Sequence, residues 1–279
     1  MKFAQKLKNL RNSRGLSQAD LADMMGVSRQ AVTKWEIEGG MPEIPNLIMI
    51  SDIFGITLDS LLRDDIPSYS SVILYDIDAG KDFEISSVST NVLTVEGWDS
   101  EKVRIDLLSD SISTLDSNIK VSIEEKKRKV AIDLKRRKEL SESECRKGLS
   151  VRIRLPRKFI EDVELEGDTG CLELKGFQAD DLEFGGSAET VFLDDVHGRA
   201  EMDISCDCKF FVMDLDGSLE INQIEQDSTV MIPKDLVFRA KDAGKKCKLN
   251  LSKGVVSTKE ADDIIILNGM KSNLTIGFM

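Results

Sequence analysis

The sequence is poor in the residues from which most catalytic and metal centres are built. Among 279 residues it has one histidine, His197, and five scattered cysteines: Cys145, Cys171, Cys206, Cys208 and Cys247. A lone histidine in a turn is usually a solvated residue, and the cysteines lack the paired spacing of a zinc site. The sequence therefore predicts no metal, no cofactor and no enzyme activity, and it predicts buried, reduced thiols.

Long apolar runs are also missing. No stretch reaches the roughly 18 consecutive apolar residues that a membrane-spanning helix needs. The first ten residues, MKFAQKLKNL, contain no uninterrupted apolar core like that of a signal peptide. We therefore expect a cytoplasmic protein with no membrane partner.

Basic residues are outnumbered, with 38 Lys and Arg against 50 Asp and Glu, for a net charge of −12. Such a balance is unusual for a protein that binds nucleic acid. The cations nevertheless gather at the start, because residues 1–34 hold seven Lys and Arg and two Asp, a net +5 that leaves −17 for the rest. A local basic face can bind phosphates while the acidic remainder disfavours unspecific contact.

The most informative stretch is SQADLADMMGVSRQAVTKWE, residues 17–36. Ser17 followed by Asp20 is a helix start signal. Gly26 stands where the first helix must stop and the chain must turn, which suits left-handed backbone angles. Ser28 can then cap a second helix, whose inner face is apolar. The pattern predicts two short helices joined by a sharp turn.

The outer face of the second helix carries only polar and basic side chains: Arg29, Gln30, Thr33 and Lys34. Arg and Lys suit the O6 and N7 acceptors of guanine, Gln suits adenine, and a Thr methyl suits thymine. This face is therefore predicted to read DNA bases. An ordinary helical hairpin that binds protein is the alternative, since a fold alone does not determine function.

With this spacing, about the first 65 residues resemble the Cro/repressor (XRE-type) helix-turn-helix family. The resemblance implies an all-α, five-helix DNA-binding head, with an opening helix at 1–12 and closing helices at 45–54 and 57–62. It also implies a homodimer or higher homo-oligomer, because the family reads two half-sites about one helical turn apart.

The resemblance assigns roles to individual residues. Bases in the major groove of double-stranded operator DNA would be read by Arg29, Gln30, Thr33 and Lys34. The DNA backbone would be contacted by Gln18, Ser28, Ser17 and Arg14. An ion pair of Arg11 with Glu36 would brace the first helix against the recognition helix.

A second, all-β domain follows. A charged stretch with Pro and Ser predicts a linker, so we place the helix-turn-helix domain at 1–66, the linker at 67–79 and an all-β repeat domain at 80–279. In the last part the apolar period changes from about 3.6 to about 2 residues. The charged segment 135–147 is the best candidate there for a helix or a charged loop.

The second half contains an internal repeat. Apolar–acidic–apolar triplets begin at Val163, Leu182, Met202 and Leu219, at spacings of 19, 20 and 17 residues, and a second strand follows each. This predicts a β-solenoid, with an antiparallel sandwich as the alternative. The repeat loosely resembles the stacked-strand, adhesin-like domain found behind some helix-turn-helix modules. That domain is expected to oligomerise the protein or to sense an unidentified effector.

Taken together, the sequence predicts a sequence-specific transcriptional regulator, a repressor that binds an inverted-repeat operator as a dimer. One alternative is a self-cleaving Ser/Lys peptidase, with Ser111 and Lys147 as the dyad and the bond after Ala79 as its target. Another is a head that binds protein on an oligomerising β scaffold. The basic runs 126–129 and 135–138 are predicted to be solvated, with a contact to the DNA backbone as the alternative.

Overall fold

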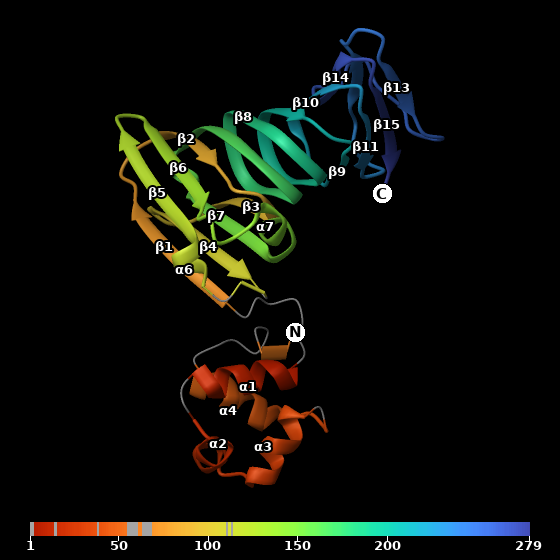
Figure 1. Cartoon of the computed structure of the whole chain (residues 1–279). Helices are drawn as coiled ribbons and strands as arrows, with labels where there is room; N and C mark the ends of the chain where they lie inside the picture. The colour runs from red at the N-terminus through yellow and green to blue at the C-terminus, as the bar shows by residue number, and fades with distance from the viewer. Residues whose placement is uncertain are drawn as a thin grey trace. The chain divides into compact units, whose positions relative to one another are not determined.

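A computed structural model describes residues 3–13, 16–37, 39–54, 61–62, 69–109, 111–112 and 114–279 (Figure 1). The chain divides into two compact units, Met1–Ser68 and Tyr69–Met279. The first is helical and the second is almost entirely β. Among the described residues, no helix combines the length and the apolar character needed to cross a bilayer.

The first unit contains four described helices: α1 (Phe3–Ser13), α2 (Gln18–Met25), α3 (Arg29–Glu36) and α4 (Ile44–Phe54). Its core is built from the apolar faces of these helices, and Leu7, Leu21, Val32 and Ile50 are fully buried. The expected fifth helix falls largely on residues 55–60, which lie outside the described part, although Leu61 and Leu62 are helical. The described residues therefore establish a helical head, with the fifth helix left as an expectation.

The junction between α2 and α3 follows the predicted start and stop signals. The Ser17 hydroxyl accepts from the Asp20 N–H, and the Asp20 carboxylate accepts in return from the Ser17 N–H, a complete capping box. Gly26 ends α2 with φ 64° and ψ 28°, in the left-handed region where glycine carries no Cβ penalty. Ser28 then caps α3 by accepting from the Ala31 N–H at 3.2 Å. These local predictions are confirmed.

The second unit contains one sheet of fifteen described strands. The strands, in chain order, are β1 (Tyr69–Asp76), β2 (Lys81–Ser86), β3 (Thr90–Trp98), β4 (Lys102–Ser109), β5 (Ile119–Lys126), β6 (Lys129–Arg136), β7 (Leu149–Pro156), β8 (Ile160–Ile204), β9 (Lys209–Val212), β10 (Asp216–Ile224), β11 (Asp227–Ile232), β12 (Arg239–Asp242), β13 (Lys248–Leu251), β14 (Ile264–Met270) and β15 (Asn273–Phe278). Short helices α6 (Leu115–Asn118) and α7 (Glu142–Gly148) and the 3-10 turn η1 (Arg157–Phe159) interrupt them.

Two of these elements differ from the sequence-based boundaries. Strand β1 occupies residues that were assigned to the linker, so the β structure begins at Tyr69 and not at residue 80. Among the described strands β1 pairs only with β4, so it is an edge strand. Its serines and the exposed Val72 and Leu74, at 48% and 54%, obscure the usual alternation of apolar and polar residues. Within the charged segment 135–147 a helix does form, α7, which a capping box of Ser141 with Glu144 starts.

Most neighbouring strands run parallel. Antiparallel pairs among the described strands are β1–β4, β4–β7 and β5–β6, all near the start of the unit. Beyond them, β10 pairs in parallel with β8 so that Asp216 lies beside His197, and β9 pairs with β8 so that Lys209 lies beside Thr190. Both registers join residues 19 apart in the sequence. The strands thus stack along the sheet at a repeat close to the one in the sequence.

One of the predicted repeat positions is out of register by two residues. The triplet that begins at Leu219 pairs with Ala200-Glu201-Met202, and not with the triplet that begins at Met202. Ala200 is buried, at 3% exposure, and fills the position that a larger apolar residue holds elsewhere. A small apolar residue weakens the pattern by which the repeat is recognised in the sequence.

The last two strands do not lie at the end of the stack. Strand β14 pairs with β10 on one side and β12 on the other, and β15 likewise lies between β11 and β13. The terminal strands of the chain are therefore inserted between strands that precede them. Among the described strands the outermost at this end are β12 and β13, of which Figure 1 labels β13.

Candidate nucleic-acid interface

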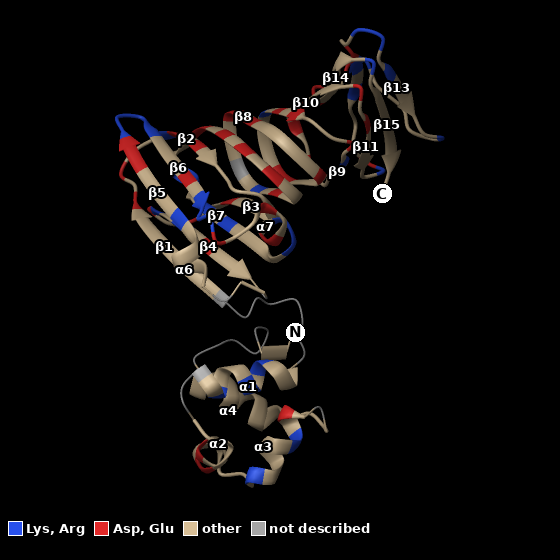
Figure 2. Cartoon of the chain, in the orientation of Figure 1, with Lys and Arg blue, Asp and Glu red and all other residues tan. Residues whose placement is uncertain are grey.

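The outer face of α3 is a basic surface open to solvent. Arg29, Gln30 and Lys34 are exposed, and Thr33 is half-buried. Neither Arg29 nor Lys34 forms an ion pair with any described residue, although acidic groups are abundant elsewhere (Figure 2). The Lys34 side chain lies along the glycine loop that follows α3, since a Cβ at Gly39 would be 2.9 Å from Lys34 Cγ. All four side chains assigned to base reading thus lie on one short helix.

Thr33 and Gln18 form a bridge between α3 and α2. The Thr33 hydroxyl lies 2.9 Å from Gln18 Oε1 and 3.0 Å from the Arg29 carbonyl, and Gln18 Nε2 donates to Glu36 Oε2 at 2.8 Å. In the free protein the Gln18 amide therefore joins two helices. The phosphate contact that the resemblance implies for Gln18 would use the second N–H of this amide nitrogen. The sequence offered no signal for this network, because its members are 15 and 18 residues apart.

Arg11 and Glu36 form a buried ion pair under the recognition helix. Arg11 Nε lies 2.6 Å from Glu36 Oε1 and Nη2 lies 2.9 Å from Oε2, a bidentate geometry, while Nη1 donates to the Leu16 carbonyl. The Glu36 side chain is 1% exposed. Burial alone would raise the pKa of Glu36, but hydrogen bonds from Arg11 and Gln18 hold that pKa below its ordinary value. The pair fixes α1 against the end of α3.

The remaining residues assigned to the DNA backbone are less informative. Ser17 and Ser28 are exposed at the starts of α2 and α3, where their hydroxyls already cap backbone N–H groups. Arg14 lies outside the described residues. The arrangement as a whole presents an amide and two cations, which have no ion pair within the described part of the chain, on a capped helix. Such groups can contact base edges and phosphates in a major groove.

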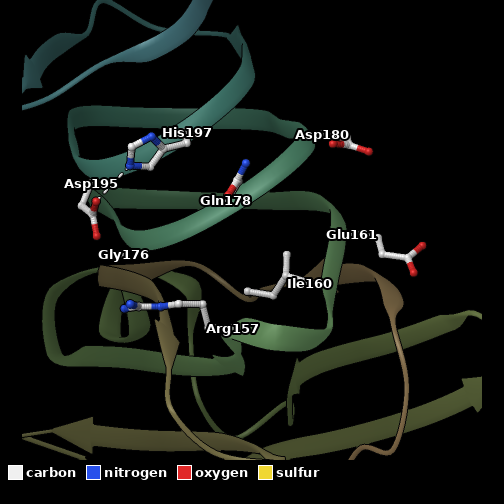
Figure 3. A pocket seen from close by; sticks show the side chains of 8 residues that line it. All are labelled: Arg157, Ile160, Glu161, Gly176, Gln178, Asp180, Asp195 and His197. Atoms are coloured by element: carbon white, nitrogen blue, oxygen red, sulfur yellow. Dashed lines mark hydrogen bonds and ion pairs between the residues drawn. The ribbon is translucent and has the colours of Figure 1, made fainter.

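The second unit contains one pocket with a distinctive titratable group. It has a volume of about 420 Å³ and is lined by Arg157, Ile160, Glu161, Gly176, Gln178, Asp180, Asp195 and His197 (Figure 3). His197 Nδ1 lies 2.8 Å from Asp216 Oδ2, and its Nε2 lies 3.0 Å from Asp195 Oδ1. Hydrogen bonds that the ring donates to the carboxylates of Asp216 and then Asp195 raise the pKa of His197 above its ordinary value.

His197 is thus held between two carboxylates, which differs from the solvated turn residue that the sequence suggested. The strand register places Asp216 directly beside His197, across two neighbouring strands. Sequence reasoning missed this contact because Asp216 is 19 residues away and the register was unknown. The aspartates favour the doubly protonated ring, in which both nitrogens donate.

We expect the His197→Gln substitution to lower the stability of the second unit in a pH-dependent way. Because the folded-state pKa is raised, the histidine's contribution is fully present below its unfolded value, about pH 6.5, and is lost as pH rises through the folded value. Denaturant unfolding of both proteins between about pH 5.5 and 9 tests this. Gln178→Ala, in the same pocket, is the control. A gap between wild type and His197→Gln that stays constant with pH would contradict the expectation.

The described thiols are all free, and burial raises the pKa of four of them. That pKa is about 11 for Cys171, and it is also raised for Cys145, Cys206 and Cys208. Cys145 and Cys208 are buried, as predicted, and the other three thiols are partly buried. A raised pKa disfavours the reactive thiolate, so these four sites are poorly suited to redox sensing.

The surroundings of Ser111 and Lys147 give little support to the alternative of a self-cleaving peptidase. Lys147 is exposed near the end of α7. A lysine that acts as a general base must be desolvated so that its pKa falls. Ser111 Oγ lies close to the position that a Cβ at Gly148 would take, so Ser111 and the end of α7 are neighbours. Lys147 nevertheless stays exposed to solvent and is not desolvated.

Residues 7–61 match the sequence family described as Helix-turn-helix. Over 65 residues, 23% of its length, the chain is 44% identical to the HTH-type transcriptional activator BcrR of Enterococcus faecalis. The match covers 32% of that protein, so the chain spans about a third of this relative. The N-terminal unit therefore contains a helix-turn-helix domain of the XRE type, homologous to those of transcriptional regulators.

Two solved structures resemble separate parts of the chain. The P22 c2 repressor, solved with a synthetic operator, is 29% identical, with 23% of this chain and 98% of that chain covered and a TM-score of 0.23. A candidate cell adhesion protein from Clostridium sporogenes is 11% identical, with 76% of this chain and 100% of that chain covered and a TM-score of 0.37.

Proposed function

We propose that this protein is a cytoplasmic, sequence-specific DNA-binding regulator of transcription that represses from an inverted-repeat operator. The observation that carries the proposal is the exposed, unpaired basic face of α3, with Arg29, Gln30 and Lys34 on a capped helix inside a helix-turn-helix match. Repression needs only that the bound protein occupies the promoter, whereas activation needs a further contact with the transcription machinery.

We further propose that the protein acts as a homodimer. One small helix-turn-helix buries little DNA surface, and two linked heads gain affinity through effective concentration. Apolar side chains are available for such an interface near the end of α3 and the start of α4, where Ile37, Met41 and Ile44 are 70%, 58% and 71% exposed. Exposed apolar side chains that gather in this way commonly serve protein contacts.

For the second unit we propose a β-solenoid that supports the two heads and senses a signal. Parallel neighbours 19 residues apart support stacked coils, since an antiparallel sandwich joins consecutive strands by hairpins. Alternate residues point into a continuous core, for example Leu172, Leu174, Leu219 and Ile221, all fully buried. The pocket beside His197 is the candidate place for an effector.

The Arg29→Ala substitution is expected to cost about 1–3 kcal/mol of binding free energy at one base position, roughly 5- to 150-fold in affinity. The reason is the loss of a bidentate contact to a guanine, so the loss should be confined to sequences that carry that base. Competition binding against operators with each base substituted in turn measures it. Lys120→Ala, an exposed lysine of the second unit, is the matched control.

Genome-wide mapping of binding sites in the host tests the proposal as a whole, with the Arg29→Ala/Gln30→Ala double variant in parallel. Discrete sites that share an inverted repeat, disappear in the variant and lie beside genes whose transcripts rise on deletion would support a dimeric repressor. Sites unaffected by the variant, or no sites, would overturn it in favour of a head that binds protein.

A further inference from the structure

The end of the second unit formed by β12, β13 and their connection is strongly basic. Residues 239–253 carry a single acidic residue, Asp242, in a chain of net charge −12. The same stretch holds six cations, which we call the basic end: Arg239, Lys241, Lys245, Lys246, Lys248 and Lys253. Figure 2 shows basic positions around β13 and in the loops nearby.

The cations of the basic end have no acidic partner among the residues that the structure describes. Elsewhere in the second unit most cations are neutralised, as in the pairs of Lys129 with Glu84, Arg146 with Glu189 and Arg199 with Asp181. No ion pair joins any of the six to a described carboxylate. All except Arg239 are exposed, and the Arg239 Nε atom is buried without a hydrogen-bond partner among the described residues.

The basic end also lies where the sheet is open. Strand β12 pairs only with β14, and β13 pairs only with β15, so each leaves its other edge free among the described strands. Lys245 and Lys246 occupy the connection between the two, where Lys246 has φ 60° and Lys245 forms a bridge to Met270. Cations therefore extend from one open strand edge to the other.

A second basic run provides a useful contrast. The hairpin of β5 and β6 contains the run 126–129 that the sequence singled out. There Lys126 pairs with Glu124, Arg128 with Glu161 and Lys129 with Glu84. Acidic residues of the protein therefore neutralise most of the positive charge of this run. Exposed cations without partners are the ones that can release counterions from DNA phosphates.

We propose that the basic end binds the phosphate backbone of the DNA that flanks the operator. This rests on the proposed function, because the head would deliver the chain to its site and the basic end would add contacts without reading bases. Lysines suit this task since an ammonium is a compact charge on a flexible stem. Two contact surfaces on one chain would also raise the affinity through effective concentration.

The test uses the full chain and two operator duplexes, one holding only the mapped site and one with about two helical turns of flanking DNA on each side. The key variant is Lys241→Gln/Lys245→Gln/Lys246→Gln/Lys248→Gln, and the matched control is Lys120→Gln/Lys126→Gln/Lys127→Gln/Lys138→Gln. We expect the key variant to bind the long duplex roughly tenfold more weakly at low salt. On the long duplex, the slope of log affinity against log salt concentration should be smaller in magnitude by about 2 to 3 for the key variant than for wild type. The control variant on either duplex, and the key variant on the short duplex, should bind like wild type.

Two further measurements, on wild type and on an arginine variant, test the proposal even if the key variant fails to fold. Wild type alone must show a steeper salt dependence on the long duplex than on the short one, and equal slopes would overturn the proposal. Replacing the same four lysines by arginine should preserve the slope. Unchanged binding by a folded key variant would mean that the lysines only keep the open strand edges from pairing with other chains.

The Arg29→Ala/Lys34→Ala variant separates this proposal from the proposed function. If the head reads DNA, this variant loses its preference for the operator yet keeps the contribution of flanking DNA. If the head does not read DNA, the variant matches wild type on every sequence, while the lysine variant still reports on the basic end.

Discussion

Gly186→Ala is expected to destabilise the second unit by more than about 3 kcal/mol, whereas Gly185→Ala changes its stability by less than about 1 kcal/mol. Gly186 has φ +143°, and a Cβ there would lie 1.9 Å from the Gly167 carbonyl oxygen of a neighbouring segment of backbone. A backbone atom cannot move aside as a flexible side chain can. A Cβ at Gly185 would meet no atom within 4 Å.

The two tryptophans allow each unit to be followed separately, because Trp35 lies in the first and Trp98 in the second. In a Trp35→Phe background, denaturant unfolding monitored by Trp98 fluorescence measures the stability of the second unit. If Gly186→Ala and Gly185→Ala lowered the free energy of unfolding equally, the close approach of the two backbones would not be the reason why Gly186 must be glycine.

Glu36→Ala is expected to destabilise the first unit by about 3–5 kcal/mol, which is enough to unfold much of a small helical domain. The substitution leaves the Arg11 guanidinium, 10% exposed, without its carboxylate, and it removes the acceptor of the Gln18 amide. Unfolding followed by Trp35 in a Trp98→Phe background measures the loss. The second unit should remain folded, and specific DNA binding should disappear.

Two controls separate the ion pair from the loss of packing. Glu36→Gln keeps the shape and one acceptor, so it should cost less than alanine, and Asp23→Ala removes an exposed carboxylate of α2. Since the folded-state pKa of Glu36 is lowered, its contribution is present above its unfolded value of about 4.3 and fades as pH falls through the folded value. A stability for Glu36→Ala within about 0.5 kcal/mol of wild type would contradict a structural role for the pair.

The helix-turn-helix could be predicted closely because its signals are local. Ser17, Asp20, Gly26 and Ser28 act on backbone groups within three or four residues, so the sequence alone indicates where α2 and α3 begin and end. The contact between Arg11 and Glu36 spans 25 residues, and only the resemblance to a known family suggested it. The bridge from Thr33 through Gln18 to Glu36 depends on how the two helices face each other, and no pattern in the sequence encodes it.

In the second unit several strands were predictable, but β1 was not, and neither were the strand partners. Alternation of apolar and polar residues marks β3, β6 and β7, but their parallel partners lie 47 to 79 residues away, and alternation says nothing about which strand lies beside which. The contact of His197 with Asp216 and the equivalence of Ala200 with Leu219 both depend on that missing register.

The insertion of β14 and β15 has a consequence for synthesis of the chain. Strands β12 and β13 leave the ribosome before β14 and β15, which are their only described pairing partners. A nascent chain that has emerged as far as residue 263 therefore exposes two strands with both edges open, and it cannot complete its fold one coil after another. The closing step is the entry of β14 and β15 into a gap that earlier segments have left, so the growing chain is exposed to mispairing until both strands have been made.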